Sequence, residues 1–259
     1  MKNKAIILVA VRLKSKRLKN KALLNLFGKP LIVQLTQRLK KSKLSSDIVW
    51  CTSKKKVDDK LEILAKKINV KIYRGGAKDV MKRFILAAKK YRANNIVRVT
   101  GDNPLTDPQI IDFMIKSHLK SKKDYTSCNS IPFGVRSEVI SLKILEKCHS
   151  MLADPNSSEY MTWMLNRPDY FKTNELTHPN SKINRPEISL TVDYPQEYKN
   201  VNEIYNFYKG KIPSLQKVIQ WLDKNKKLLK RLKKKRTVKK PKNINIKFKK
   251  FYEKKDFNL

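Results

Sequence analysis

The sequence predicts an α/β fold with a mostly parallel central sheet and helices on both of its faces. Two observations carry this prediction. In the first 120 residues, short apolar runs alternate with segments in which apolar residues recur every three or four positions. The first run, residues 5–11, is continuously apolar, as in a strand buried on both faces. Strands that alternate with helices are typical of a parallel sheet covered on both sides.

The expected elements follow in order along the chain. Pro30 suits the first turn of a helix, and Asp107 before Pro108 suits a helix cap. Strands are expected at residues 5–11, 47–51, 70–73 and 96–100. Helices are expected at residues 30–39, 57–68, 79–91 and 106–119. Ligands of such sheets bind beyond the carboxyl ends of the strands, so the loops after the strands matter most.

The pattern changes after residue 124. Short strands are expected at 124–128 and 136–141, helices at 142–152 and 157–166, a strand at 188–192 and a helix at 195–208. We interpret residues 124–187 as a small α+β insertion lobe within one domain that spans residues 1–223. Residues 224–259 hold 17 Lys or Arg and two acidic residues, and we expect them to form a flexible basic tail.

The formal net charge is +38, from 60 Lys and Arg against 22 Asp and Glu. Such a charge can attract nucleic acid or an anionic membrane, and Phe248, Phe251 and Tyr252 in the tail could stack on bases or insert at a bilayer surface. The charge is spread along the chain rather than gathered in a patch. We therefore favour a solvated basic surface over specific nucleic-acid binding.

The sequence also excludes some classes of protein. It has no run of about 18 apolar residues, so no membrane span is expected. Its three cysteines show no CxxC spacing, which argues against a zinc site or a disulfide framework. The cysteines fit a reducing compartment, so we expect a cytoplasmic protein.

A cationic loop follows the first strand directly. It reads R-L-K-S-K-R-L-K-N-K from Arg12 to Lys21, and six of its ten residues are cationic. Several cations with a hydroxyl such as Ser15 suit a bound triphosphate. A solvated basic loop is the alternative, and charge alone does not separate the two.

Two aspartates follow apolar strands at the same expected edge of the sheet. Asp102 ends the strand at 96–100, and Asp193 ends the strand at 188–192. Magnesium is commonly held by one or two carboxylates together with phosphate oxygens. As a pair, Asp102 and Asp193 predict a Mg²⁺ site, whereas either one alone is more often structural.

With these residues in place, the chain resembles the cytidylyltransferase family, which makes CMP-activated sugars, and in particular its spore coat polysaccharide biosynthesis protein F-like members. The resemblance covers roughly residues 4–208. It rests on ordered motifs: R-x-x-S-x-R-L-x-x-K from Arg12, F-G-K-P-L-I from Phe27, Y-R-G-G-A-K-D-V from Tyr73, V-R-V-T-G-D-N-P-L-T-D-P from Val97, G-x-x-x-E ending at Glu138, and L-T-V-D-Y-P-Q-E-Y from Leu190.

The resemblance implies a nucleotidyltransferase fold related to glycosyltransferase type A. It implies that a sugar hydroxyl attacks the α-phosphorus of CTP, giving a CMP-sugar and pyrophosphate, and that the protein can form a homodimer. The implied catalytic residues are Arg12, Lys21 and Asp102. The implied nucleotide-binding residues are Arg12, Ser15, Arg17, Lys21, Arg74 and Asp79, the sugar-binding residue is Glu138, and the Mg²⁺ ligands are Asp102 and Asp193.

The phosphate loop departs from the family pattern at two positions. Lys14 stands where the family usually has Gly, and Lys19 where it has Pro. Glycine allows a close backbone approach to phosphates. A catalytically impaired nucleotide-binding scaffold of the same fold is therefore a second hypothesis, and binding of nucleic acid or anionic membranes through the tail is a third.

Overall fold

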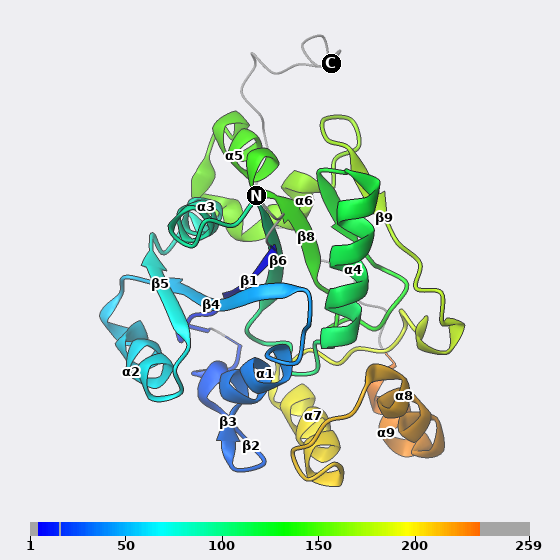
Figure 1. Cartoon of the computed structure of the whole chain (residues 1–259). Helices are drawn as coiled ribbons and strands as arrows, with labels where there is room; N and C mark the ends of the chain where they lie inside the picture. The colour runs from blue at the N-terminus through cyan, green and yellow to red at the C-terminus, as the bar shows by residue number, and fades with distance from the viewer. Residues whose placement is uncertain (1–4, 16, 234–259) are drawn as a thin grey trace.

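The computed structural model describes residues 5–15 and 17–233, which build one seven-stranded sheet with helices on both faces (Figure 1). The strand order is β5 (Lys71–Gly75), β4 (Ser45–Ser53), β1 (Ala5–Ala10), β6 (Asn95–Thr100), β8 (Glu138–Ser141), β7 (Tyr125–Ser127) and β9 (Thr173–Glu175). Only β8 of these strands runs antiparallel to its neighbours. The predicted fold class is confirmed.

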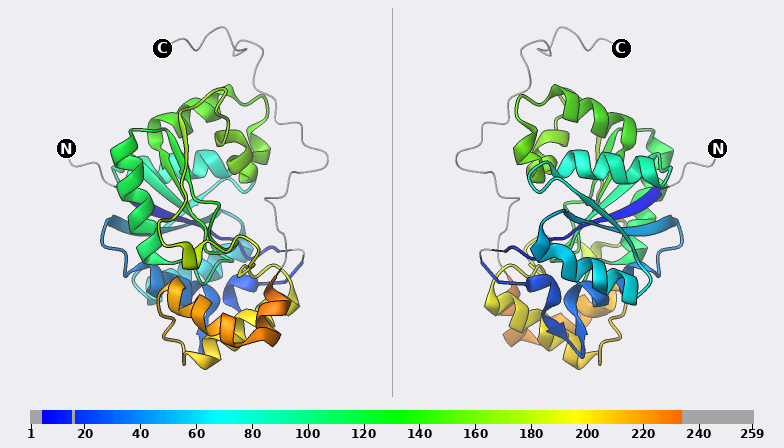
Figure 2. Two further views of the ribbon diagram at one scale, coloured as in Figure 1. Left: turned by 90° about the vertical axis from the view of Figure 1, so that its right-hand side faces the viewer. Right: turned by 90° about the vertical axis from the view of Figure 1, so that its left-hand side faces the viewer.

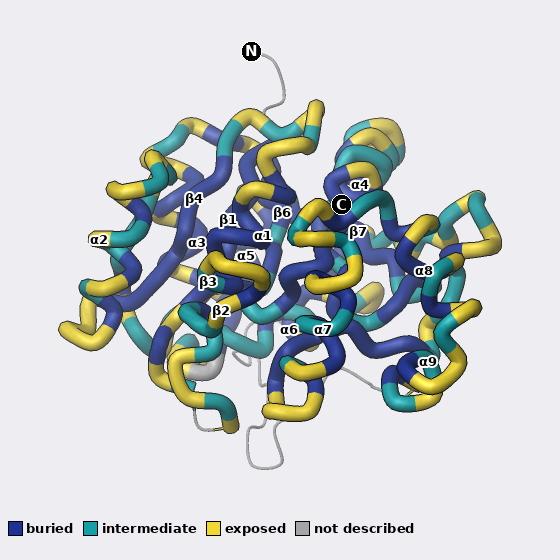
Figure 3. The backbone as a smooth tube through the Cα atoms, turned by 90° about the horizontal axis from the view of Figure 1, so that it is seen from below, coloured by how far each residue is buried: buried dark blue, intermediate teal, exposed yellow. Residues whose placement is uncertain are grey.

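Alternate residues of the central strands face two separate cores. Ile7 and Val9 of β1 pack into the core on one face, and Ile6 and Leu8 into the core on the other. The first core is covered by α1 (Leu31–Leu39), α2 (Asp59–Lys67) and α4 (Pro108–Ser121), and the second by α3 (Val80–Lys90), α5 (Leu142–Met151) and α6 (Met161–Leu165). Figure 3 shows the central strands as the buried middle of the molecule. A strand covered on both faces accounts for the unbroken apolar run of residues 5–10.

Every strand and helix expected in the first 120 residues is present. The signals at the start of α4 also have the expected role, because the Asp107 side chain accepts a hydrogen bond from the backbone N–H of Gln109 at 2.8 Å and Pro108 opens the helix. Between η1 (Lys21–Leu23) and α1 the chain adds a hairpin of β2 (Asn25–Leu26) and β3 (Lys29–Pro30), which the apolar pattern did not predict.

The strand predicted at residues 188–192 is wrong. Ile188 and Ser189 make only isolated bridges, to Lys233 and Phe133. Ile188, Leu190 and Val192 are nevertheless fully buried in the first core. The apolar run therefore reflects burial of an irregular segment rather than a sheet ladder.

Residues 124–187 do not form a lobe set apart from the sheet. Their strands β7, β8 and β9 extend the central sheet beyond β6, and β9 itself was not predicted. Helices α5 and α6, with the 3-10 segment η3 (Pro155–Tyr160), pack beside α3 on the second core.

The C-terminal part of the described chain is helical. Helix α7 (Pro195–Phe207) is followed by α8 (Leu215–Lys224) and α9 (Lys226–Leu232). These helices lie at the same end of the molecule as the β2–β3 hairpin, and α7 contacts β2 (Figure 2). The expectation of a flexible tail from residue 224 is wrong for α9, because Leu228 and Leu232 are buried one helical turn apart in the first core. Residues 234–259, including the tail aromatics and most of the tail's charge, lie outside the described residues.

None of the described helices is long and apolar enough to cross a membrane.

We expect Leu228→Ala to destabilise the protein by about 2–4 kcal/mol, because it removes a buried side chain and leaves a cavity beneath α9. Lys230→Ala on the exposed side of the same helix is the matched control and should change the free energy of unfolding by less than about 0.5 kcal/mol. Urea denaturation of both variants measures the difference. Equal small effects would show that α9 is not packed as described.

Candidate functional site

The centre of the candidate site is an ammonium group between two carboxylates. Lys21 Nζ donates to Asp102 Oδ2 at 2.5 Å and to Asp193 Oδ1 at 2.9 Å. The Arg17 guanidinium donates to the same Asp193 oxygen at 2.6 Å. Four residues predicted from sequence, which lie up to 176 positions apart, therefore form one charged cluster.

Three members of the cluster, Lys21, Asp102 and Asp193, lie next to secondary-structure elements. Asp102 follows β6 at the carboxyl edge of the sheet, and Lys21 opens η1 after the cationic loop. The backbone N–H of Val192 donates to the Asp102 carbonyl oxygen at 2.9 Å, which brings Asp193 alongside. The Asp193 N–H donates to the Glu197 carboxylate in the first turn of α7 at 2.9 Å.

The cluster favours the charged forms of Lys21 and Asp193. Burial lowers the pKa of Lys21, but the carboxylates of Asp102 and Asp193 outweigh it, and the net pKa is raised. Burial raises the pKa of Asp193, but Lys21 and then Arg17 outweigh it, and the net pKa is lowered. At neutral pH both groups are charged, so the cluster offers cations to phosphates and carboxylates to a metal.

The two carboxylates fit a magnesium ion that is shared with a substrate. Both reach a single atom, the Lys21 Nζ, so their oxygens can also converge on one cation. The part of the chain that the structure describes contains no group of three or more His, Cys, Asp or Glu that would hold a metal by itself. Two carboxylates completed by phosphate oxygens are typical of Mg²⁺ in nucleotide enzymes.

Hydrogen bonds to a buried carboxylate hold the first residues of the cationic loop in place. The buried Asp58 carboxylate accepts from the backbone N–H of Leu13 at 2.8 Å and from the Ser53 hydroxyl. Arg12 is half exposed and pairs with Glu159 of η3 at 2.8 Å, instead of joining the Lys21 cluster. The backbone N–H of Ser15 donates to the Leu13 carbonyl at 2.9 Å, which tightens the turn. No local pattern in the sequence indicates this role of Asp58.

The two departures from the family's loop fit this conformation. Lys14 and Lys19 are both exposed. Lys14 does not adopt the positive φ that would require glycine. The extra side chains therefore impose no strain on the loop, and they add charge at its surface.

A cavity of about 410 Å³ lies next to the cluster, and Thr100 and Asn103 on either side of the Gly101–Asp102 pair line it. Its other lining residues are Arg98, Tyr125, Ser127, Asn129, Phe133, Gly134, Arg136, Ser137, Glu138, Thr162, Trp163 and Asn166. Arg98 Nε, Asn103 Oδ1 and Ser127 Oγ are buried and have no hydrogen-bond partner within the described residues. Orphaned polar atoms on a cavity wall indicate a polar ligand.

Glu138 is part of this cavity wall, as its predicted sugar-binding role requires. Its two oxygens accept from Arg98 at 2.5 Å and from the Tyr125 hydroxyl at 2.6 Å. Burial, and then the Glu138 charge, raise the pKa of Tyr125, so its hydroxyl stays a donor. The sequence reasoning missed Arg98, although a cation inside the apolar V-R-V-T strand is a visible signal.

Arg136 gives the cavity a surplus positive charge. The Arg98 and Glu138 charges neutralise each other, whereas within residues 5–15 and 17–233 no ion pair involves Arg136. Its guanidinium donates to the Ile131 carbonyl at 3.0 Å and lies 5.6 Å from the centre of the Phe133 ring. The charges on the wall therefore favour an anionic ligand.

Arg74 and Asp79 lie in other surroundings. Arg74 pairs with Asp59 at 2.6 Å and Glu62 at 2.7 Å, which ties β5 to α2. Asp79 caps α3 by accepting from the backbone N–H of Lys82, and its other oxygen contacts His149 Nε2 at 2.7 Å. In this structure both side chains hold helices in place, and their nucleotide-binding role stays a prediction.

The fold and the site together define an α/β protein with a cationic loop and paired carboxylates at the carboxyl edge of a sheet. The family model described as "Cytidylyltransferase" matches residues 6–244, so the chain belongs to the cytidylyltransferase family.

Similar proteins cover most of the chain. An uncharacterized protein of Methanocaldococcus jannaschii is 37% identical over 86% of this chain and 91% of its own length. The spore coat polysaccharide biosynthesis protein SpsF of Bacillus subtilis is 29% identical over 78% of this chain and 87% of its own. The solved structure of a cytidylyltransferase from Leptospira borgpetersenii superimposes with a TM-score of 0.78 at 28% identity, over 92% of this chain and 99% of the other.

Gly134 provides a test of the cavity's shape. A Cβ at this position would lie 2.3 Å from the backbone nitrogen of Thr191, and its φ of +91° suits glycine alone. We expect Gly134→Ala to lower the free energy of unfolding by about 2 kcal/mol or more. The added methyl group would force the backbone at residue 134 away from the segment that carries Asp193. Gly76→Ala, where a Cβ meets nothing within 4 Å, is the control. Thermal unfolding that is unchanged in Gly134→Ala would contradict the described packing.

Proposed function

We propose that the protein transfers CMP from CTP to a sugar and releases pyrophosphate. The observation that carries the proposal is the convergence of Lys21, Asp102 and Asp193 beside a polar cavity, in a chain of the cytidylyltransferase family. The cluster would face the triphosphate, and the cavity would hold the acceptor sugar. The sugar hydroxyl then attacks the α-phosphorus, and the bond from that phosphorus to the pyrophosphate oxygen breaks.

The cations of the chain would stabilise the charge that develops on the leaving pyrophosphate. Lys21 can exchange its carboxylate partners for phosphate oxygens, because it is the last residue of the cationic loop and its ammonium lies between the two proposed metal ligands. Arg12 and Arg17 are about half exposed and can turn toward the same phosphates. Positioned cations of this kind act by orientation and charge neutralisation rather than by a covalent intermediate.

Asp102 and Asp193 would hold Mg²⁺ together with the phosphates. The metal would supply Lewis-acid stabilisation of the phosphoryl oxygens. In the structure described here Lys21 pairs with both carboxylates, which holds the two residues close together.

The acceptor sugar would carry a carboxylate. Arg136 supplies a positive charge on the cavity wall that no acidic side chain among the described residues neutralises by an ion pair. The orphaned Asn103 and Ser127 oxygens are positioned to bind sugar hydroxyls. A guanidinium binds a planar carboxylate better than it binds a neutral hydroxyl, because two N–H groups can donate in parallel.

The CMP-sugar would serve the synthesis of a surface polysaccharide or glycan, a role supported by the name of the Bacillus subtilis relative. We place the reaction in the cytoplasm, and the buried free thiols of Cys51, Cys128 and Cys148 are compatible with that reducing compartment.

Pyrophosphate release from each of the four nucleoside triphosphates, with Mg²⁺ and a panel of acidic and neutral sugars, tests the proposal. We expect release with CTP and one acidic sugar, and a fall of about 100-fold or more in Asp102→Asn, because a metal ligand is lost. Asp223→Asn, which removes a surface partner of Arg185, should keep its activity. Equal rates in wild type and Asp102→Asn would contradict the metal role.

If no sugar in the panel gives pyrophosphate release while CTP still binds, the alternative of a catalytically impaired nucleotide-binding scaffold is supported. The Lys14→Gly, Lys19→Pro double variant then separates an impaired loop from a non-catalytic protein. Recovery of turnover would assign the defect to the loop, and continued silence would favour the scaffold.

Arg136→Met tests the substrate class. We expect kcat/KM for the acidic sugar to fall by about 30- to 100-fold, since a charge-assisted hydrogen bond contributes about 2–3 kcal/mol. The corresponding sugar amide should react with wild type and variant at rates within a few-fold of each other. A fall of the same size for both acceptors would show that Arg136 only shapes the cavity.

A further inference from the structure

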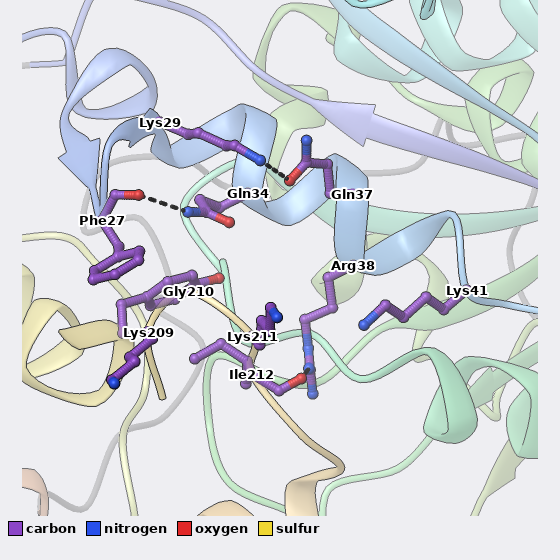
Figure 4. Close-up of a pocket in the computed structure, with 11 residues that line it drawn as sticks. Phe27, Lys29, Gln34, Gln37, Arg38, Lys41, Lys209, Gly210, Lys211 and Ile212 are labelled. Atoms are coloured by element: carbon purple, nitrogen blue, oxygen red, sulfur yellow. Dashed lines mark hydrogen bonds between the residues drawn. The ribbon is translucent and has the colours of Figure 1, made fainter. Parts of the chain in front are cut away.

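A second cavity, of about 340 Å³, lies between α1 and the turn after α7 (Figure 4). Its lining includes five cationic side chains, those of Lys29, Arg38, Lys41, Lys209 and Lys211. None of the described residues that line it is a carboxylate. This arrangement differs from the Lys21 cluster, where cations and carboxylates alternate.

The cationic groups occupy different places in the cavity. Figure 4 shows Lys41 and Lys211 on either side of Arg38, whereas the Lys209 ammonium points away from it. The buried Arg38 guanidinium is already satisfied, because it pairs with Asp107 at 2.9 Å and donates to the Ile212 carbonyl at 2.8 Å. The lysines therefore supply the cavity's surplus charge, and their mutual repulsion is relieved when an anion lies between them.

One wall is apolar and held in a fixed position. Phe27 and Gly28 form the turn of the β2–β3 hairpin with φ of +44° and +79°, a conformation that is unusual for a bulky residue such as Phe27. Its ring covers Gly210, where a Cβ would lie 2.8 Å from Phe27 Cδ1. Phe27 remains 46% exposed, so an aromatic surface borders the cationic part of the cavity.

We propose that this cavity is a second binding site, separate from the candidate active site, for a small molecule that carries a phosphoryl group. The lysines would bind the phosphoryl oxygens through charge-assisted hydrogen bonds, and the Phe27 side would accept the organic part of the molecule. Phosphate chemistry is favoured over a lone carboxylate because the Lys41 and Lys211 ammonium groups lie on either side of Arg38 and can both donate to one phosphoryl group.

The site adjoins residues that hold the active-site loop. Arg38 donates to the Thr106 carbonyl at 2.9 Å, and the Tyr205 hydroxyl donates to the Pro104 carbonyl at 2.9 Å. Both carbonyls belong to the loop that begins at Gly101 and carries Asp102. An occupant would therefore contact the side chains that fix this loop, and its binding would alter the affinity for CTP. This second consequence rests on the proposed function.

Calorimetric titration of the full chain with inorganic phosphate, at fixed ionic strength, tests the binding site. We expect Lys41→Ala/Lys211→Ala to lower the phosphate affinity at least tenfold. Lys40→Ala/Lys217→Ala removes the same charge from exposed neighbouring positions that do not line the cavity, and it should stay within twofold of wild type. Equal losses in both variants would mean an adventitious ion only, attracted by the overall charge, and no loss in either would also overturn the site.

The same variants test the link to the active site. In Lys41→Ala/Lys211→Ala, phosphate should affect KM for CTP only by simple competition with the nucleotide. In wild type and in the control variant, phosphate should change KM for CTP by more than this competition. An identical phosphate effect in all three proteins would overturn the link. Calorimetry measures phosphate binding without turnover. If the chain fails to transfer CMP, the proposed function is contradicted, and the titration still decides whether the cavity binds phosphate.

Discussion

The ion pairs of Lys21 with Asp102 and Asp193 are the interaction on which the rest of the site depends. Asp102 and Asp193 contact the same ammonium nitrogen. Two carboxylates this close would repel each other if no cation lay between them. The segment that carries Asp193 has no sheet ladder to hold it, since only isolated bridges involve its first residues. Its place is set by the burial of Ile188, Leu190 and Val192, by single backbone hydrogen bonds such as that from Val192 to Asp102, and by the Lys21 ammonium. The Lys21 side chain thus links the cationic loop, the end of β6 and the segment that precedes α7.

Local charge balance separates the functional regions more clearly than the total charge does. The net charge of +38 is spread over the whole sequence and identifies no ligand. The Lys21 cluster is nearly neutral and suits a metal with a triphosphate. The neighbouring cavity has one surplus guanidinium, which suits a carboxylate, and the α1 cavity has several ammonium groups, which suit a phosphoryl group. The local excess of charge in each region, rather than the net charge of the chain, indicates the chemical class of its ligand.

The sequence predicted regular elements well where periodicity and burial agree. The four parallel strands and their helices are present because a strand buried on both faces needs an unbroken apolar run, and its helices need one apolar stripe. The same rule failed at residues 188–192, where an irregular segment is buried as deeply as a strand. It failed again at α9, whose many lysines hid Leu228 and Leu232 at helical spacing.

The sequence by itself determined the fold class, the cationic loop and the two aspartates that follow apolar runs, because each depends on residues that are neighbours in the chain. Only the tertiary structure decided that Lys21 contacts carboxylates 81 and 172 positions away, and that Arg12 and Asp79 have other partners. It also decided that Arg136 makes no ion pair with any of the described acidic residues, and that lysines from α1 and the turn after α7 share a cavity. The pairing of charges across the fold depends on how the layers pack, and no local pattern in the sequence encodes those distances.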